Sequence, residues 1–161
     1  MEVRSAVLPD AGTISALNCE VQALHAAALP HLFKPAAPTV FSAHEIRQLL
    51  TDPSTLMFIA HESGQPAGYI YAQVIEGSET PYRHAWKRLH IHHISVSREC
   101  QRTGIGRALL GELLEAARQR GLSTITADFW SFNEGAREFF KAQGFIAYNE
   151  NIWLELEPGP K

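Results

Sequence analysis

The chain has 161 residues, enough for about one domain with a hydrophobic core of its own. Its formal net charge of −3 disfavours a nucleic-acid-binding protein, which is usually basic. The sequence lacks the run of about 18 apolar residues that a membrane span needs, and its start, MEVRSAVLPD, lacks the apolar stretch of a signal peptide. Two cysteines, Cys19 and Cys100, make neither a disulfide framework nor a CxxC zinc pair, so we expect a cytoplasmic protein without nucleic-acid or membrane partners.

Hydrophobic periodicity divides the chain into strands and helices. Apolar residues at steps of three and four mark buried helix faces, and short β-branched and aromatic runs mark strands. Asp10 is placed as an N-cap, Pro30 ends the first helix, and Ser42 with Glu45 forms a capping box. In chain order we predict a strand at 2–8, helices at 10–29 and from 42, strands at 55–62, 66–76 and 89–97, a helix at about 104–120, a strand at 122–129, a helix at about 133–143 and extended structure at 145–157.

The order of these elements, β-α-α-β-β-β-α-β-α-β-β, predicts the fold class. It is typical of an α/β protein with one mixed β-sheet flanked by helices. We expect a single domain at residues 1–156 and a flexible C-terminal tail at 157–161. The strand, helix and strand between residues 90 and 129 predict a parallel, right-handed crossover.

The stretch QRTGIGR, residues 101–107, joins a predicted strand to a long apolar helix. The first four N–H groups of a helix have no partner within it, and the helix dipole adds positive charge there. Gly104 and Gly106 remove side-chain bulk, while Arg102 and Arg107 add cationic groups, so the stretch predicts a phosphate site. It matches neither a Walker loop nor GxGxxG, which disfavours nucleotides and NAD. A tight turn without a ligand is the alternative.

The segment HISVSRECQRTGIGRALLGELLEAARQRG resembles the acyl-CoA-binding segment of the GNAT N-acetyltransferase superfamily, and FNEGAREFFKAQGF resembles that family's second segment. The resemblance implies acetyl-CoA as co-substrate, held along a strand edge that parts from the next strand, and in the loop. The backbone would carry these contacts, so we expect substitutions at Ser95 to be tolerated. The implied cofactor-binding residues are Ile94, Ser95, Val96, Gln101, Arg102, Thr103, Gly104, Ile105, Gly106, Arg107, Asn133 and Phe140.

Two positions depart from the family pattern. Phe140 stands where the family usually has the tyrosine that protonates the leaving thiolate, so Cys100, Tyr148 or a water molecule is left for that role. His92 stands where a carboxylate is frequent. An imidazole with an ordinary pKa near 6.5 suits a general base, which makes His92 the catalytic candidate. Strand alternation would place His92 on one side of its strand and His93 on the other.

The alternatives for these histidines are a structural role in the strand, or a metal site built from a His-x-His pair with a third ligand from another element. We expect no metal. The resemblance also places the acceptor pocket near the first helix, its following loop and the polar loop before the histidine strand. The substrate-binding candidates are His25, His31, Phe33, Glu79 and Trp86.

Together these features predict an enzyme that moves an acetyl group from acetyl-CoA to a primary amine of a small molecule by direct attack. One alternative is a protein or peptide N-acetyltransferase acting on an N-terminal or lysine amine. Another is a CoA-binding sensor without catalysis, which the missing tyrosine keeps open. Exposed edges of the C-terminal extended structure would be compatible with a homodimer. The sequence names neither the acceptor amine nor the length of the acyl group.

Overall fold

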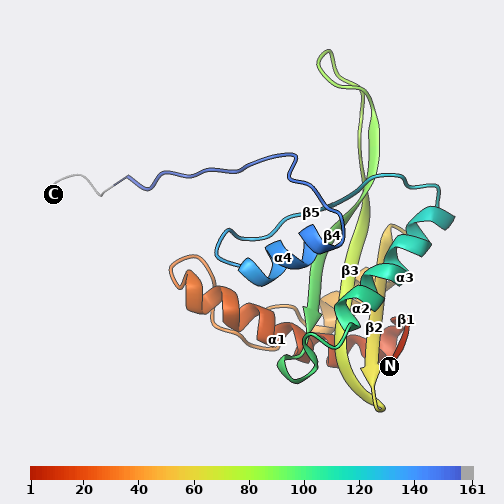
Figure 1. Cartoon of the computed structure of the whole chain (residues 1–161), viewed down its shortest axis with the longest axis vertical. Coiled ribbons are helices and arrows are strands. Elements are labelled where there is room, and N and C mark those ends of the chain that lie inside the picture. Colours follow the sequence, from red (N-terminus) through yellow and green to blue (C-terminus); the bar gives the residue numbers. More distant parts are fainter. Residues whose placement is uncertain (157–161) are drawn as a thin grey trace. The chain divides into compact units, whose positions relative to one another are not determined.

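The computed structural model of the chain describes residues 1–156, so the flexible tail expected at 157–161 lies outside the described residues. Contacts between residues divide the chain into two compact units, Met1–Asp128 and Phe129–Lys161. The first unit holds the β-sheet and three of the helices, and the second holds the remaining helix. Figure 1 shows the elements of both units.

A five-stranded mixed sheet forms the centre of the first unit, with its strands in the order β1-β2-β3-β4-β5 (Figure 1). The first four strands pair antiparallel, and β4 and β5 pair parallel, as the crossover predicted. The predicted fold class, a single mixed sheet flanked by helices, is confirmed. The strands are β1 (Glu2–Ser5), β2 (Thr55–Glu62), β3 (Gln65–Gly77), β4 (Trp86–Val96) and β5 (Ile125–Ala127).

Helices cover both faces of this sheet. One core joins α1 (Ala11–Ala28) and α2 (Ala43–Thr51) to alternate residues of two strands, among them Met57 and Tyr69. The opposite face packs against α3 (Ile105–Gln119), whose Leu109 lies beside Gly68, the residue before Tyr69. The alternation of side chains along a strand therefore separates the two layers. Among residues 1–156, no helix has both the length and the apolar composition that a membrane crossing requires.

Asp10 is the N-cap residue of α1, as predicted, but its side chain makes no capping hydrogen bond. Its carboxylate instead accepts two hydrogen bonds from the Arg4 guanidinium, at 2.7 and 2.8 Å, and one from the Val7 backbone N–H at 2.8 Å. The Arg4 hydrogen bonds hold the pKa of Asp10 below its usual value. Asp10 therefore ties the end of β1 to the start of α1. The Ser42 cap of α2 forms as predicted, with its Oγ accepting from the Glu45 N–H at 3.2 Å.

The second unit contains α4 (Glu134–Ala142), which an aromatic cluster stabilises. Phe140 packs against Phe129, Phe139 and Phe145, with ring centroids 5.1 to 6.0 Å apart. In the described residues no strand follows α4, so the last two strands predicted at 145–157 are wrong through residue 156. A strand persists only when a neighbouring strand satisfies its backbone groups, and no described strand pairs with this segment.

Gly68 lets β3 and β4 approach each other. A Cβ atom at this position would lie 2.5 Å from the Ser95 backbone oxygen and 3.2 Å from the Val96 Cα. We therefore expect Gly68→Ala to lower the free energy of unfolding by about 1–3 kcal/mol, the usual cost of overpacking. Thermal and denaturant unfolding measure the change.

Gly111, inside α3, is the matched control, because a Cβ atom there meets nothing within 4 Å. Gly111→Ala should raise the free energy of unfolding by about 0.5–1 kcal/mol, since alanine loses less backbone entropy in a helix. Equal stability of the Gly68→Ala variant and the natural chain would contradict the close approach.

Candidate functional site

A β-bulge in β4 brings two neighbouring histidines to the same face of the sheet. Tyr71 of β3 pairs with His93 and Ala72 pairs with Ile91, so His92 is an extra residue in β4. Both imidazole rings pack on Tyr71, with centroids 4.9 Å away for His92 and 5.6 Å for His93. The prediction that these histidines point to opposite sides is therefore wrong, because strict alternation fails at a bulge.

His90 extends this face and is held at both of its ring nitrogens. Its Nε2 lies 3.0 Å from Asp128 Oδ1, and its Nδ1 lies 3.0 Å from Thr126 Oγ1. The hydrogen bond with His90 holds the pKa of Asp128 below its usual value. The His90 ring lies edge-on to His92, with centroids 4.8 Å apart. His90 therefore positions its neighbour and offers no unoccupied nitrogen within this arrangement.

His92 reaches solvent and carries the chemistry that a base needs. Partial burial, and next the nearby His90, lower its pKa below the ordinary value, while Asp128 opposes this shift. The imidazole is therefore mostly neutral near pH 7, and a neutral imidazole accepts a proton. His90, His92 and His93 together form one surface of β4, the histidine face. The structure places His92, the predicted catalytic residue, on this face.

His93 lies deeper than His92 and belongs to a buried polar chain. The Tyr69 hydroxyl lies 3.1 Å from His93 Nδ1, and Asn18 Nδ2 donates to the same hydroxyl oxygen at 2.8 Å. Burial lowers the pKa of His93 to about 4. Sequence analysis missed Asn18 and Tyr69. A polar residue inside the apolar stripe of the first helix, facing a tyrosine in a buried strand, is the signal that could have found them.

Three of the five acceptor candidates, His25, His31 and Phe33, belong to α1 and the turn that follows it. His25 of α1 stacks on Phe33, with ring centroids 4.9 Å apart, and it is close enough to contribute to the lowered pKa of His93. His31 lies in the turn that follows α1, between these two residues in sequence. His25 thus places the later part of α1 near the histidine face.

The other two acceptor candidates lie elsewhere. Glu79 and Trp86 belong to the β3–β4 hairpin, where Trp86 packs on Gly77 and beneath the Arg88 guanidinium, 4.3 Å from the ring centroid. Trp86 is six residues from His92 along β4, about 20 Å at 3.3 Å per residue. The structure thus does not bring Glu79 and Trp86 together with His25, and one small acceptor cannot touch both groups.

The strands β4 and β5 part beyond Ile91, the geometry that the resemblance implies. Their last paired residues are Ile91 and Ala127, and no described strand pairs with this edge of β4 from His92 onward. The Ser97 N–H donates to the Ala67 oxygen on the β3 side. Antiparallel alternation therefore turns the N–H and C=O groups of Ile94 and Val96 toward the open edge.

Ser95 lies between Ile94 and Val96 and points the other way. It is 5% exposed, and its hydroxyl donates to the Leu17 oxygen of α1 at 3.4 Å. The expectation that substitutions at Ser95 are tolerated is therefore wrong for larger side chains, because this residue packs in the core between α1 and the sheet.

The start of α3 leaves its first backbone amides uncapped. Gly104 is the N-cap in a left-handed conformation, with φ of 94°, and no side chain accepts from this helix end. By contrast, Ser42 caps α2, and Asn133 caps α4. Ile105 and Gly106 therefore present N–H groups without an intrahelical acceptor, which suits an anion. Glycine is favoured at position 104 for its left-handed conformation, since a Cβ atom there would meet nothing within 4 Å.

The loop before α3 holds itself in place and is tied to β4. The Thr103 hydroxyl donates to the Cys100 oxygen at 2.6 Å, and Gln101 Nε2 donates to the Val96 oxygen at 3.2 Å. Arg102 and Arg107 are exposed on either side of the glycines. The loop before the uncapped helix start is thus joined to the open strand edge by the hydrogen bond from Gln101.

In the second unit, two predicted cofactor residues have structural partners. The Asn133 side chain accepts from the Ala136 N–H at 3.0 Å and caps α4. Phe140 is 5% exposed within the aromatic cluster and has no proton to give. Their contacts with a cofactor stay a prediction.

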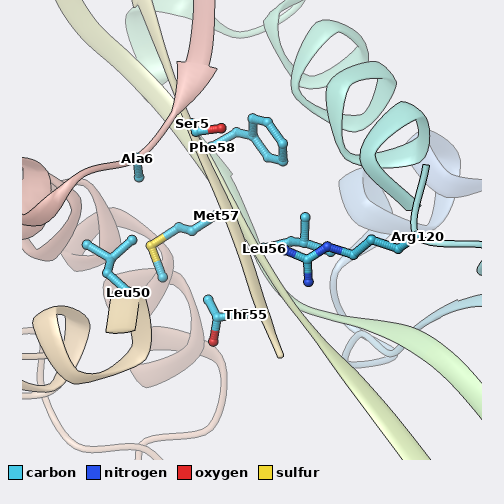
Figure 2. A pocket seen from close by; sticks show the side chains of 8 residues that line it. All are labelled: Ser5, Ala6, Leu50, Thr55, Leu56, Met57, Phe58 and Arg120. Carbon is cyan, nitrogen blue, oxygen red and sulfur yellow. The ribbon is translucent and has the colours of Figure 1, made fainter. Parts of the chain in front are cut away.

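A hollow of about 200 Å³ lies beside β1 and β2. Figure 2 shows the side chains that line it. None of the predicted site residues lines it, and Arg120 at its rim donates to the Pro53 oxygen at 3.0 Å. Its lining residues are Ser5, Ala6, Leu50, Thr55, Leu56, Met57, Phe58 and Arg120. The side chains that line this hollow include no group of histidines comparable to the histidine face. In residues 1–156, no cluster of three histidine, cysteine or acidic side chains could hold a metal ion.

Comparison with known proteins identifies the family. The model of the acetyltransferase (GNAT) family matches residues 20–145, most of the chain, and the chain therefore belongs to this family. In sequence it is 26% identical to mouse N-acetyltransferase family 8 member 3 over 110 residues, which cover 68% of this chain and 47% of that protein. The chain thus spans about half the length of the mouse relatives it matches.

Solved structures share the fold at low identity. A mutant of the BH1408 protein from Bacillus halodurans superposes with a TM-score of 0.91 at 19% identity, over 97% of this chain and all of that one. An aminoglycoside 6'-N-acetyltransferase from Acinetobacter haemolyticus gives 0.70 at 16% identity, over 98% and 99%. A predicted acetyltransferase from Clostridium acetobutylicum, solved with acetyl-CoA, gives 0.71 at 18%, over 97% and 95%.

Because Arg107 lies beside the uncapped amides of α3, we expect its substitution to weaken anion binding without lowering the stability of the fold. Arg107→Glu removes a cation and adds an anion beside the amides, so we expect the Kd for coenzyme A to rise at least about tenfold. A carboxylate in the first turn favours the helix, so the melting temperature should not fall. Calorimetry and thermal unfolding measure the two effects.

Arg118→Glu is the control for Arg107→Glu. It changes the net charge equally, but lies 11 residues further along α3, about 16 Å away and beyond the Debye length of about 8 Å. An equal loss of coenzyme A affinity in both variants would show a general charge effect and refute the anion site.

Proposed function

We propose that the chain transfers an acetyl group from acetyl-CoA to the primary amine of a small molecule by direct attack. One observation carries this proposal. The open edge of β4 at Ile94 and Val96 is continuous with His92 at one end and, through Gln101, with the uncapped start of α3 at the other. A base, a strand-like binding edge and an anion site therefore follow one another along a single strand and loop.

The described residues suit the parts of coenzyme A. The amides of Ile105 and Gly106, with Arg102 and Arg107, would hold the pyrophosphate. The pantetheine arm carries two amides, and the outward N–H and C=O groups of Ile94 and Val96 could pair with them as a neighbouring strand would. When bound, acetyl-CoA supplies the acetyl group as a thioester.

The histidine face supplies the proton transfer that amide formation needs. An amine is mostly ammonium near pH 7, and neutral His92 accepts a proton from it, directly or through one water molecule. The amine nitrogen then bonds to the thioester carbonyl carbon, gives up its second proton to solvent, and the carbon–sulfur bond breaks, with the thiolate taking a proton from solvent. The Val96 N–H faces the side on which negative charge develops at the carbonyl oxygen.

The electrostatics favour a cationic acceptor. Asp128 lies near His92, and Glu45 and Asp52 lie near enough to Tyr71 to contribute to its raised pKa. Carboxylates on this side attract an ammonium group and repel an anion. Two structural neighbours described as aminoglycoside N-acetyltransferases, and one solved with acetyl-CoA, support an amine acceptor and this acyl donor.

Turnover of acetyl-CoA with a panel of amines tests the function. We expect release of free thiol with small primary amines, and mass spectrometry should find the acetylated product. Turnover only with peptides would favour the peptide acetyltransferase. Binding of acetyl-CoA without turnover of any amine would refute the enzyme and favour the sensor.

If His92 is the base, its protonation should set the acidic limb of the rate. The folded pKa of His92 lies below the ordinary value of about 6.5, so kcat/KM should be full above it and fall as pH drops through it. His92→Gln should lose about 10²-fold in kcat/KM, keep the affinity for acetyl-CoA, and lose this limb.

His44, exposed on α2, supplies the matched control, because His93 shares the face of His92 and cannot serve. His44→Gln should leave the rate and its pH profile unchanged. A His92→Gln variant with near-normal rates and the same acidic limb would show that His92 is structural.

A further inference from the structure

The buried chain of Asn18, Tyr69 and His93 determines where the His93 ring carries its proton. The Asn18 Nδ2 group can only donate, so the Tyr69 oxygen accepts at 2.8 Å. The single hydroxyl proton of Tyr69 is then directed at His93 Nδ1, 3.1 Å away. Because Nδ1 accepts, the proton of the neutral ring lies on Nε2.

The surroundings keep this arrangement rigid and neutral. Asn18 is 6% exposed and Tyr69 is fully buried, so neither has water as an alternative partner. Burial lowers the pKa of His93 to about 4, which keeps the ring uncharged at neutral pH. Phe41 meets the ring edge-on, with centroids 4.7 Å apart, and restrains its orientation.

Within residues 1–156, His93 Nε2 has no hydrogen-bond partner from the protein, and it is not among the buried atoms that lack one, so it reaches the surface of the histidine face. A donor in a largely apolar setting gains from finding an acceptor. The aromatic side chains beside it, Phe41 and Tyr71, offer none through their rings. This group is therefore available to a ligand that enters the histidine face.

The bulge decides which part of a ligand this donor meets. His92 and His93 are consecutive and pack on the same tyrosine, with Cα atoms about 3.8 Å apart. If His92 receives the amine proton, His93 faces an atom close to the amine nitrogen. Asp128, which lies close enough to His92 to oppose the lowering of its pKa, disfavours an anionic group there.

We propose that His93, held as the Nε2–H tautomer by Tyr69 and Asn18, donates a hydrogen bond to a hydroxyl on the carbon next to the acceptor amine. The acceptor class is thus a 1,2-amino alcohol, a group that amino sugars also contain. This inference rests on the proposed function and adds to it a residue that selects the substrate. The roles of the two histidines differ: His92 takes a proton, whereas His93 keeps its own.

Kinetics with two matched amines test the selection. 2-Aminoethanol and n-propylamine have the same number of heavy atoms, and only the first has the hydroxyl. We expect the ratio of their kcat/KM values to fall about tenfold in His93→Phe, which retains a ring without the donor. His93→Gln places an N–H group at a similar reach and should restore most of the ratio.

His92→Gln separates selection from catalysis, because it should slow both amines equally and leave the ratio unchanged. An unchanged ratio in His93→Phe would overturn the proposal. No turnover of any amine by the natural chain would refute the proposed function and, with it, the acceptor class.

Nitrogen-15 NMR of the imidazole rings tests His93 independently of turnover. The natural chain should show the Nε2–H tautomer from pH 6 to 8, and Tyr69→Phe should shift the population toward Nδ1–H, because Nδ1 loses its donor. An Nδ1–H tautomer in the natural chain would overturn the proposal even if amines were acetylated.

Discussion

One extra residue in β4 changes which side chains this strand presents to each layer of the fold. Before the bulge, Ile91 pairs with Ala72 and so faces the layer of α3; after it, His93 pairs with Tyr71 and faces α1. Without the insertion these two odd-numbered residues would share a face. The bulge therefore lets one strand bury apolar residues against α3 and then direct polar residues toward α1.

The same strand loses its second neighbour just past the bulge. Because β5 pairs only as far as Ala127, the outward backbone groups of Ile94 and the Val96 N–H have no strand partner, while the Val96 oxygen accepts from Gln101. In most sheets an unpaired edge is a liability that a protein covers or blunts. Here the unpaired edge of β4 adjoins the start of α3, whose first amides no side chain caps. An open strand edge followed by uncapped helix amides favours a long ligand that carries both amide and phosphate groups.

The histidines of this face differ in role because they differ in surroundings. His90 is held between Thr126 and Asp128, His93 is half-buried and bonded to Tyr69, and His92 is the most exposed of the three. Burial favours the neutral imidazole, since charging a ring away from water is costly. One residue type thus occupies three different environments within four positions.

Much of the fold followed from the sequence alone. Periodicity, turn residues and the Ser42 cap are local signals, so they predicted the helices and the first strands, and the QRTGIGR stretch predicted the helix start that lacks a cap.

Local signals did not reveal the bulge, because an inserted residue is defined by its partner strand and not by its neighbours in sequence. They also did not reveal the Asn18–Tyr69 hydrogen bond, which joins residues 51 positions apart. The C-terminal apolar run failed as a strand for the same reason: alternation predicts a strand, but only a partner strand with free backbone groups makes one.

The sequence by itself determined which residues are present for the chemistry and which form helices and strands. The tertiary structure decided which histidines share a face and how each holds its proton, because both depend on strand pairing and burial, which no local pattern contains.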